Sequence, residues 1–471
     1  MVSVCPSTIW RFHRKELILQ GKNKRSYDNQ CIYESSFFCT LLNKMNCQTC
    51  TLDNGLRVIL LPSASKVAYC GYALAVGSRH EPPGMEGMAH FCEHITFKGT
   101  ERRSAMQILN CLETVGGDLN AFTNKEHTVY YATVMRQHLA RAIDLLTDIV
   151  FNSTYPQTEI DKEVEVICDE IESYNDSPAE LIFDEFENVL FPNHPLGHNI
   201  LGDAEQLHRF TTADALRFTH EHYRTENAVF FVAADVTLLE VVKMVNAKCG
   251  PRGCRGAGVR ACENRLSAET NPAPSQSRTF APTKTLVPPN KVIIRQRGTH
   301  QAHVMMGCKA FDMHDDRRIA LFLLNNILGG PAMNSRLNLA LRERRGLVYT
   351  VESSMVTYSD TGAWSTYFGC DAKDVKRCLH LVRRELDRLM EKSLTETQMR
   401  TAKGQLKGQL GIASDNRESF TLDVAKNFLH RGWEIDIDEL FFRIDNLTAL
   451  SMQQVACELF EPSRMTTLIY Q

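Results

Sequence analysis

Two histidines and a glutamate in the segment 87–94 have the types and the spacing of a metal site. A helix is expected from about Gly87, and on a helix His90, Glu93 and His94 fall within an arc of about 100°. Histidines four positions apart can supply two ligands to one tetrahedral zinc ion. A glutamate just before the second histidine can accept the proton of an attacking water, as in the inverted HxxEH motif. The segment predicts zinc-dependent hydrolysis with Glu93 as general base.

A catalytic zinc needs a third protein ligand and an open fourth position. A second helix, expected over 157–174, carries Glu163 and Glu170, which are seven positions apart and lie on nearly the same face. Acidic helix faces are usually only solvated, but beside the HxxEH segment Glu170 is the expected third ligand. Glu163 is expected to accept a hydrogen bond from a liganding imidazole. The rival ligands Cys92 and Cys168 point about 200° away on their helices, so we expect core residues there.

The composition narrows the class of protein. The 471 residues are 43% hydrophobic and 23% charged, with a net charge of -3, which excludes disordered, collagen-like and coiled-coil chains. A chain so close to neutral is not expected to bind nucleic acid, and without a long apolar run no membrane span is expected. The 16 cysteines are scattered along the chain and many lie in apolar stretches, so we expect reduced thiols rather than a disulfide framework.

The order of expected elements occurs twice. The first series contains strands and helices over 56–61, 67–76, 105–115, 118–123, 127–134, 137–151 and 228–232. The second contains strands and helices over 291–295, 302–309, 317–328, 375–392 and 466–470. The fold class predicted is α+β, with two tandem homologous α/β-sandwich domains, each an antiparallel-rich sheet packed with helices.

The domain boundaries follow from these series. Residues 1–50 are basic, lack the apolar core of a secretory signal, and are expected to be a disordered extension. We expect a catalytic domain over 51–249, a Pro-rich linker over 250–290, and a second domain over 291–471.

The second domain is expected to lack the metal site. Aligning the two series places Leu321 and Asn325 where the first has His90 and His94. The positions of Glu163 and Glu170 are taken by the cations Arg400 and Lys407. An aliphatic side chain and two cations cannot hold zinc, so the second domain is expected to support the first.

The HxxEH segment, with Glu170 76 positions after His94, resembles the pitrilysin/insulinase family of zinc peptidases, which includes the mitochondrial processing peptidase. The resemblance covers about Leu52 to the C-terminus, and the length is similar to that of the compact bacterial branch. It implies that His90, His94 and Glu170 hold one Zn²⁺ ion and that Glu93 is the general base.

Two further segments resemble functional parts of this family. The segment 116–123 resembles the edge strand that pairs with the substrate backbone; its binding residues would be Gly117, Leu119, Asn120, Ala121 and Phe122. In the second domain, Arg342 and Tyr349 resemble a pair that holds the substrate carbonyl. A guanidinium and a phenol can donate hydrogen bonds to the charge that develops on that oxygen.

The family resemblance implies an endopeptidase for peptides or unfolded segments. In the family two such domain pairs close around a chamber, which implies a homodimer or a heterodimer with a related chain. The alternative is a non-catalytic or partner-dependent subunit of a processing-peptidase-like heterodimer. The expected location is the bacterial cytoplasm, with the mitochondrial matrix as the alternative.

Overall fold

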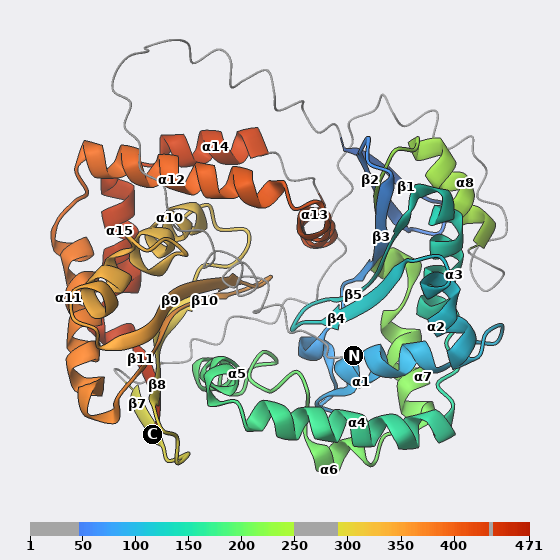
Figure 1. Ribbon diagram of the computed structural model, residues 1–471, viewed down its shortest axis with the longest axis horizontal. Helices are drawn as coiled ribbons and strands as arrows, with labels where there is room; N and C mark the ends of the chain where they lie inside the picture. Colours follow the sequence, from blue (N-terminus) through green and yellow to red (C-terminus); the bar gives the residue numbers. More distant parts are fainter. Residues whose placement is uncertain (1–46, 249–290, 433–436) are drawn as a thin grey trace, which may run out of the picture.

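The computed structural model describes residues 47–248, 291–432 and 437–471, which form two sheets covered by helices (Figure 1). The expected linker 250–290 and nearly all of the expected extension 1–50 lie outside the described residues. One boundary was misplaced, because a first strand, β1 (Gln48–Thr51), begins before residue 51. Within the described residues, no helix combines the length and hydrophobicity needed to cross a membrane.

The first sheet has six strands in the order β1-β2-β6-β3-β5-β4. Only β2 and β6 pair in parallel, and the other neighbours are antiparallel. Every residue of β6 is buried, as expected for a central strand covered on both faces. The strand β4 is an edge strand. The strands after β1 are β2 (Arg57–Pro62), β3 (Val67–Leu74), β4 (Asp118–Thr123), β5 (Thr128–Met135) and β6 (Ala228–Ala234).

The second sheet repeats the topology of the first. Its order is β7-β11-β8-β10-β9, with β7 and β11 parallel and the other pairs antiparallel. Strand by strand this matches β2-β6-β3-β5-β4, so the predicted tandem α+β fold is confirmed. The strands are β7 (Lys291–Arg295), β8 (Ala302–Ala310), β9 (Val348–Thr357), β10 (Gly362–Cys370) and β11 (Thr466–Tyr470).

The helices follow the same repeat. Those of the first half are α1 (Met88–Ile95), α2 (Ala105–Glu113), α3 (Leu139–Asn152), α4 (Gln157–Asn175), α5 (Pro178–Leu190), α6 (Ala204–Leu207), α7 (Thr212–His222) and α8 (Leu238–Lys248). Those of the second half are α10 (Arg318–Gly329), the π-helical turn η8 (Asn338–Glu343), α11 (Val375–Glu391), α12 (Glu396–Ser414), α13 (Arg417–Arg431), α14 (Ile437–Asn446) and α15 (Ala449–Leu459). The helices before β6 and β11 both start with a capping box, at Thr211 and Thr448.

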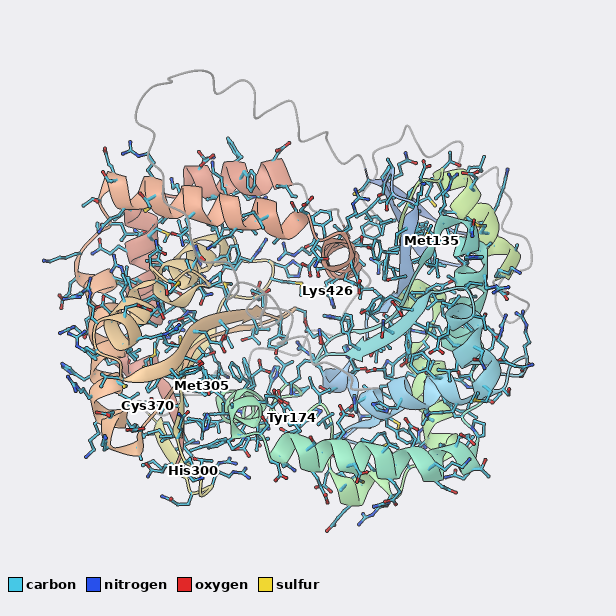
Figure 2. All side chains as sticks on the ribbon, in the orientation of Figure 1. Met135, Tyr174, His300, Met305, Cys370 and Lys426 are labelled. Carbon is cyan, nitrogen blue, oxygen red and sulfur yellow. The ribbon has the colours of Figure 1, made fainter. Side chains whose placement is uncertain are left out.

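One helix from each half of the chain packs on the sheet of the other half. The helix α5 packs on β8 and β11, where Phe186 and Ile182 join the buried cluster of the second sheet. The helix α13 packs on β2, β3 and β6 through Phe428 and Val424. Figure 2 shows Lys426 of α13 on the border between the two halves. Burying these apolar faces holds the halves together.

The tips of two hairpins also meet across the border between the halves. The Glu126 carboxylate, in the turn between β4 and β5, accepts hydrogen bonds from the backbone N–H and the hydroxyl of Ser359, in the turn between β9 and β10. Arg79 donates to both Glu126 and Asp360. The turn that ends β4 is therefore fixed to the second half.

A buried histidine pair belongs to the same border. His127 lies in the turn between β4 and β5, and His430 lies on α13. The distance from His127 Nδ1 to His430 Nε2 is 3.2 Å, and the Asn124 side chain contacts Nε2 of His127. Burial, together with His430 and Lys426, lowers the pKa of His127 well below its usual value. His127 therefore stays neutral in the folded chain at a pH where it is protonated in the unfolded chain.

This linkage predicts loss of stability in mild acid. Below about pH 6.5 the unfolded state binds a proton that folded His127 does not, so the free energy of unfolding falls by up to about 1.4 kcal/mol per pH unit. The variant His127→Gln is expected to show a shallower decline between pH 7.5 and 5 in urea titrations. The exposed control His220→Gln should keep the wild-type slope, and equal slopes for all three proteins would contradict this role.

Candidate metal centre

The helix α1 lies between β4 and α4 and carries the HxxEH segment as predicted. The helix begins directly after Gly87, whose φ of 96° is in the left-handed region that favours glycine. His90 and Glu93 are each only 4% exposed. Polar groups buried this deeply are costly unless they are paired or bind a metal.

Three predicted ligands come together at the contact of α1 and α4. Ligand atoms of His90, His94 and Glu170 all lie within 4.8 Å of one another. The Glu170 Oε2 atom is 3.4 Å from His94 Nε2 and 3.9 Å from His90 Nε2. A tetrahedral zinc ion with bonds of about 2.0–2.2 Å separates its ligand atoms by roughly 3.3–3.6 Å. The donor set therefore fits a zinc ion: the Glu170–His94 separation lies in this range, and the Glu170–His90 separation is 0.3 Å wider than its upper limit.

Glu163 holds His94 from the side opposite Glu170, as the spacing on α4 predicts. Its Oε1 is 3.1 Å from His94 Nδ1, so Nε2 faces Glu170. Lys98, one turn after His94, pairs with the other oxygen of Glu163 at 2.5 Å. Sequence reasoning missed Lys98, although its spacing of four from His94 is the helical signal that could have identified it.

The two imidazoles differ in their surroundings. Burial, then the neighbouring His94, lowers the pKa of His90 to about 3, so His90 is neutral and keeps a lone pair for a metal. Burial also opposes the charge on His94, but hydrogen bonds to Glu163 and Glu170 outweigh it and raise its pKa to about 9. A divalent cation at this point would compete with the proton on His94.

Glu93 is placed to act as a base. Burial raises its pKa to about 7, opposed by His94 and by a hydrogen bond with Thr123, the last residue of β4. A carboxylate with a pKa near neutrality can both accept and release a proton at physiological pH. The contact with Thr123, which sequence reasoning missed, places this carboxylate at the end of the edge strand.

The expected substrate strand has one free edge. All six residues of β4 pair with β5, and within residues 47–248, 291–432 and 437–471 no strand pairs with its other side. Leu119 and Ala121 pack against the core on the side of α1, whereas Asn120 is exposed and Phe122 packs on the opposite face. Gly117, just before β4, passes close to Val134, where a Cβ atom would meet Val134 Cγ1 at 2.7 Å.

Arg342 and Tyr349 lie in the second half of the chain. Arg342 is on η8, and its Nε atom is 3.9 Å from Glu343 Oε1. Tyr349 lies near the start of β9 and is 79% exposed. Their expected contact with a substrate carbonyl stays a prediction.

The rival ligands do not join the metal group. Cys92 is fully buried in the core, beside Met88, as predicted. Cys168 packs against the core but is only half-buried, and it lines a cavity of about 300 Å³ with Asn199 and Gly202. The prediction of a core position for Cys168 is therefore right only in part, because α4 is covered there by a loop.

The matching region of the second half offers no ligands. Leu321 is buried, Asn325 accepts a hydrogen bond from Trp364, and Lys407 pairs with Asp445. Within the part of the chain that the structure describes, His90, His94 and Glu170 are the group arranged to hold a metal.

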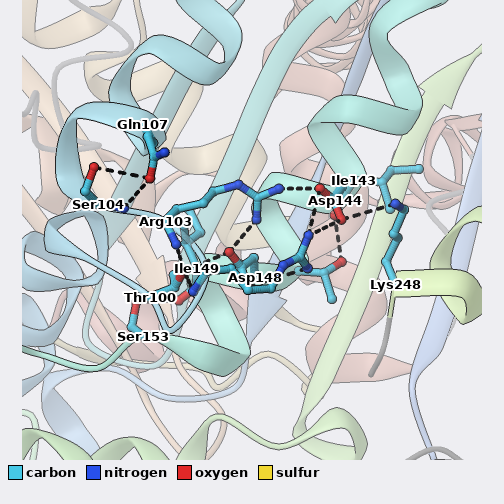
Figure 3. A network of polar contacts seen from close by, with 12 residues as sticks. Thr100, Arg103, Ser104, Gln107, Ile143, Asp144, Asp148, Ile149, Ser153 and Lys248 are labelled. Carbon is cyan, nitrogen blue, oxygen red and sulfur yellow. Dashed lines mark hydrogen bonds and ion pairs between the residues drawn. The ribbon is translucent and has the colours of Figure 1, made fainter. Parts of the chain in front are cut away.

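A polar network fixes the segment that follows α1 (Figure 3). Arg103 pairs with both Asp144 and Asp148 on α3, and Thr100 donates to Asp148 at 2.9 Å. The hydroxyl of Ser153 donates to the Thr96 carbonyl, just after α1. Since Asp148 is 1% exposed, these bonds are shielded from water and hold the end of α1 against α3.

Models of known families match most of the chain. The model "Insulinase (Peptidase family M16)" matches residues 57–204, which include the whole metal group, and "Peptidase M16 inactive domain" matches residues 209–406. The chain belongs to the insulinase family, peptidase family M16. The predicted resemblance is thereby confirmed, and the second match agrees with the loss of ligands in the second half.

The chain is similar to several proteins named as proteases. It is 33% identical to an uncharacterized zinc protease of Streptomyces coelicolor over 86% of this chain and 85% of the relative. It is 32% identical to the uncharacterized zinc protease YmxG of Bacillus subtilis, over 89% of this chain and 97% of the relative. The mitochondrial-processing peptidase subunit beta of Pongo abelii is 28% identical over 95% of this chain and 89% of the relative.

A solved structure shares the fold. A protease from Helicobacter pylori superposes with a TM-score of 0.77 at 21% identity, covering 91% of this chain and all of that one. This likeness supports the tandem architecture.

We predict graded losses of zinc from substitutions on α4. Removing the ligand in Glu170→Gln should abolish stoichiometric zinc. Glu163→Gln, which releases the orientation of His94, should weaken binding about 10–100-fold. Metal content after dialysis against chelators of increasing strength measures both effects. Glu165→Gln, at an exposed position of the same helix, and Cys168→Ser should bind like wild type; loss of zinc in Cys168→Ser would contradict the ligand set.

Proposed function

We propose that the protein is a zinc-dependent metalloendopeptidase that cleaves peptides or unfolded segments. The observation that supports the proposal is that the Glu93 carboxyl group interacts both with His94 and Glu170, of the group that could hold a metal, and with Thr123, the last residue of the edge strand β4. Membership of the insulinase family and relatives named zinc proteases support the same chemistry.

The roles of the residues follow from their positions. His90, His94 and Glu170 hold the ion, and Glu163 keeps His94 oriented. A zinc ion held there supplies a Lewis acid that activates water and polarises the substrate carbonyl. Glu93 accepts the proton of the attacking water and then delivers it to the nitrogen of the leaving amine.

Substrate binding is proposed at the free edge of β4. An extended peptide would add a seventh strand, with backbone hydrogen bonds providing affinity with little dependence on sequence. The register would lead the peptide past Thr123 toward Glu93. Exposed Asn120 and the small Ala121 leave room for varied side chains along this strand.

Arg342 and Tyr349 are proposed to donate hydrogen bonds to the substrate carbonyl oxygen. The exposure of Tyr349 means that a substrate, or a second chain, has to cover it before it can act. A homodimer or a heterodimer with a related chain would enclose the site. The rival function, a subunit that binds peptides without cleaving them, is tested by the same experiment.

The main prediction concerns Glu93→Gln. The amide cannot accept a proton, so hydrolysis of a quenched mixed-sequence peptide library should fall at least 10³-fold, while zinc content remains one ion per chain. A chelator should abolish wild-type cleavage, and added zinc should restore it. Glu165→Gln serves as the matched control with full activity.

Three results would count against the proposal. Wild type that holds zinc but cleaves nothing points to the non-catalytic or partner-dependent subunit. Cleavage by Glu93→Gln at the wild-type rate removes this residue from the mechanism. Absence of zinc from wild type refutes the site.

A further prediction tests Tyr349. If its hydroxyl stabilises charge that develops on the carbonyl oxygen, Tyr349→Phe should lower kcat about 10–10³-fold and leave KM within about twofold. Steady-state kinetics on one fluorogenic peptide measures both constants. Tyr174→Phe, at the junction of α4 and α5, is the control; a change confined to KM in Tyr349→Phe would assign the phenol to ground-state binding.

A further inference from the structure

The start of α1 is capped from outside the helix. The N-cap residue, Gly87, has no side chain, so the first N–H groups of α1 need another acceptor. Glu81 supplies it. One oxygen of its carboxylate accepts from the Ala89 N–H at 2.8 Å, and the other accepts from the Gly87 N–H at 2.9 Å. The negative charge also lies at the positive end of the helix dipole.

The Glu81 carboxylate is itself held by a second loop. Its side chain is fully buried, and His198 Nε2 lies 2.9 Å from the oxygen that binds Gly87. The loop of His198 touches the start of α1 through two glycines. A Cβ atom on Gly87 would meet Gly202 Cα at 2.8 Å, and both glycines have positive φ. The contact therefore tolerates no side chain.

The same loop is joined to the turn that ends β4. The buried amine of Lys125, in that turn, donates to the backbone carbonyl of His198. The backbone N–H groups of Ser78 and Arg79, just before Glu81, donate to the carbonyls of Asn124 and Lys125. A continuous set of hydrogen bonds thus connects the end of β4, through His198 and Glu81, to the N–H of Ala89, which precedes His90.

We propose that Glu81 is a positioning residue that fixes the start of α1 and so sets His90 and Glu93 relative to both β4 and Glu170. It touches neither metal nor substrate, and it acts through the backbone of α1, with His198 holding its carboxylate in place. This inference rests on the proposed peptidase function. The Arg103 network fixes the segment after the end of α1, and Glu81 fixes its start, so the helix is held at both ends.

The test compares Glu81→Gln with a matched variant, Asp214→Asn. Asp214 is also an acidic group that accepts a backbone N–H at a helix start, that of α7, which packs on α1 but carries no ligand. Zinc dissociation constants come from chelator competition and unfolding midpoints from thermal melts. We expect Glu81→Gln to weaken zinc binding at least tenfold. The NH₂ group of the glutamine cannot accept a hydrogen bond, so one of the two backbone N–H groups loses its acceptor. Asp214→Asn should stay within twofold of wild type.

Kinetics separates positioning from general loss of stability. At saturating zinc, Glu81→Gln should lower kcat at least tenfold with KM within twofold, since β4 still binds the peptide. Glu81→Asp, which keeps the charge, should recover part of the zinc affinity. An unchanged zinc dissociation constant in a folded but less stable Glu81→Gln would overturn the proposal.

His198→Ala keeps the inference testable if Glu81→Gln does not fold. This substitution keeps the two hydrogen bonds from backbone N–H groups to Glu81, but it removes the imidazole that holds the carboxylate in place. We expect it to weaken zinc binding about threefold or more. Wild-type zinc affinity in His198→Ala would overturn the proposal. Failure of the peptidase function appears separately, as wild type that binds no zinc or cleaves no peptide, since the effect of Glu81 on zinc affinity is measured without turnover.

Discussion

The contact between α1 and α4 buries the imidazoles of His90 and His94 beside the carboxylates of Glu93, Glu163 and Glu170. The free energy needed to remove these groups from water is the main constraint on the structure of the first half of the chain. Charges removed from water are retained when they are paired or bind a metal. Here Glu163 is balanced by His94 and Lys98, and Glu170 faces both histidines. His90 is neutral because burial lowers its pKa, so its Nε2 atom, 3.9 Å from Glu170 Oε2, can offer a lone pair. A divalent cation between Nε2, Nε2 and the Glu170 carboxylate is the simplest group that satisfies this arrangement.

Contacts with other segments fix α1 at both of its ends. Glu81 binds the start of the helix, and the network of Arg103, Asp144 and Asp148 binds the segment after its end. The exchange of α5 and α13 between the two sheets, together with the contact of Glu126 and Ser359, fixes the second half against the turn of β4. The second half therefore holds the turn that ends β4, and it carries Arg342 and Tyr349, for which we propose contact with the substrate carbonyl.

The predictable features were the local ones. His90, Glu93 and His94 lie within five positions, so helical geometry alone placed them on one face, and the seven-residue spacing of Glu163 and Glu170 did the same for α4. Contacts between distant segments carry no such periodicity. The bond of Glu81 to α1, the contact of Thr123 with Glu93 and the exchange of α5 and α13 could not be obtained that way. The strand β1 was missed because it is short and mostly exposed, which leaves no alternating pattern.

The measurement that tests the central claim most directly is anomalous diffraction at the zinc edge from crystals of the zinc-loaded protein. The account predicts one peak per chain, about 2.0–2.2 Å from His90 Nε2, His94 Nε2 and a carboxylate oxygen of Glu170, with Glu93 near the open side of the ion. A peak at other side chains, such as Cys168 and His208, or no peak in protein saturated with zinc, would contradict it.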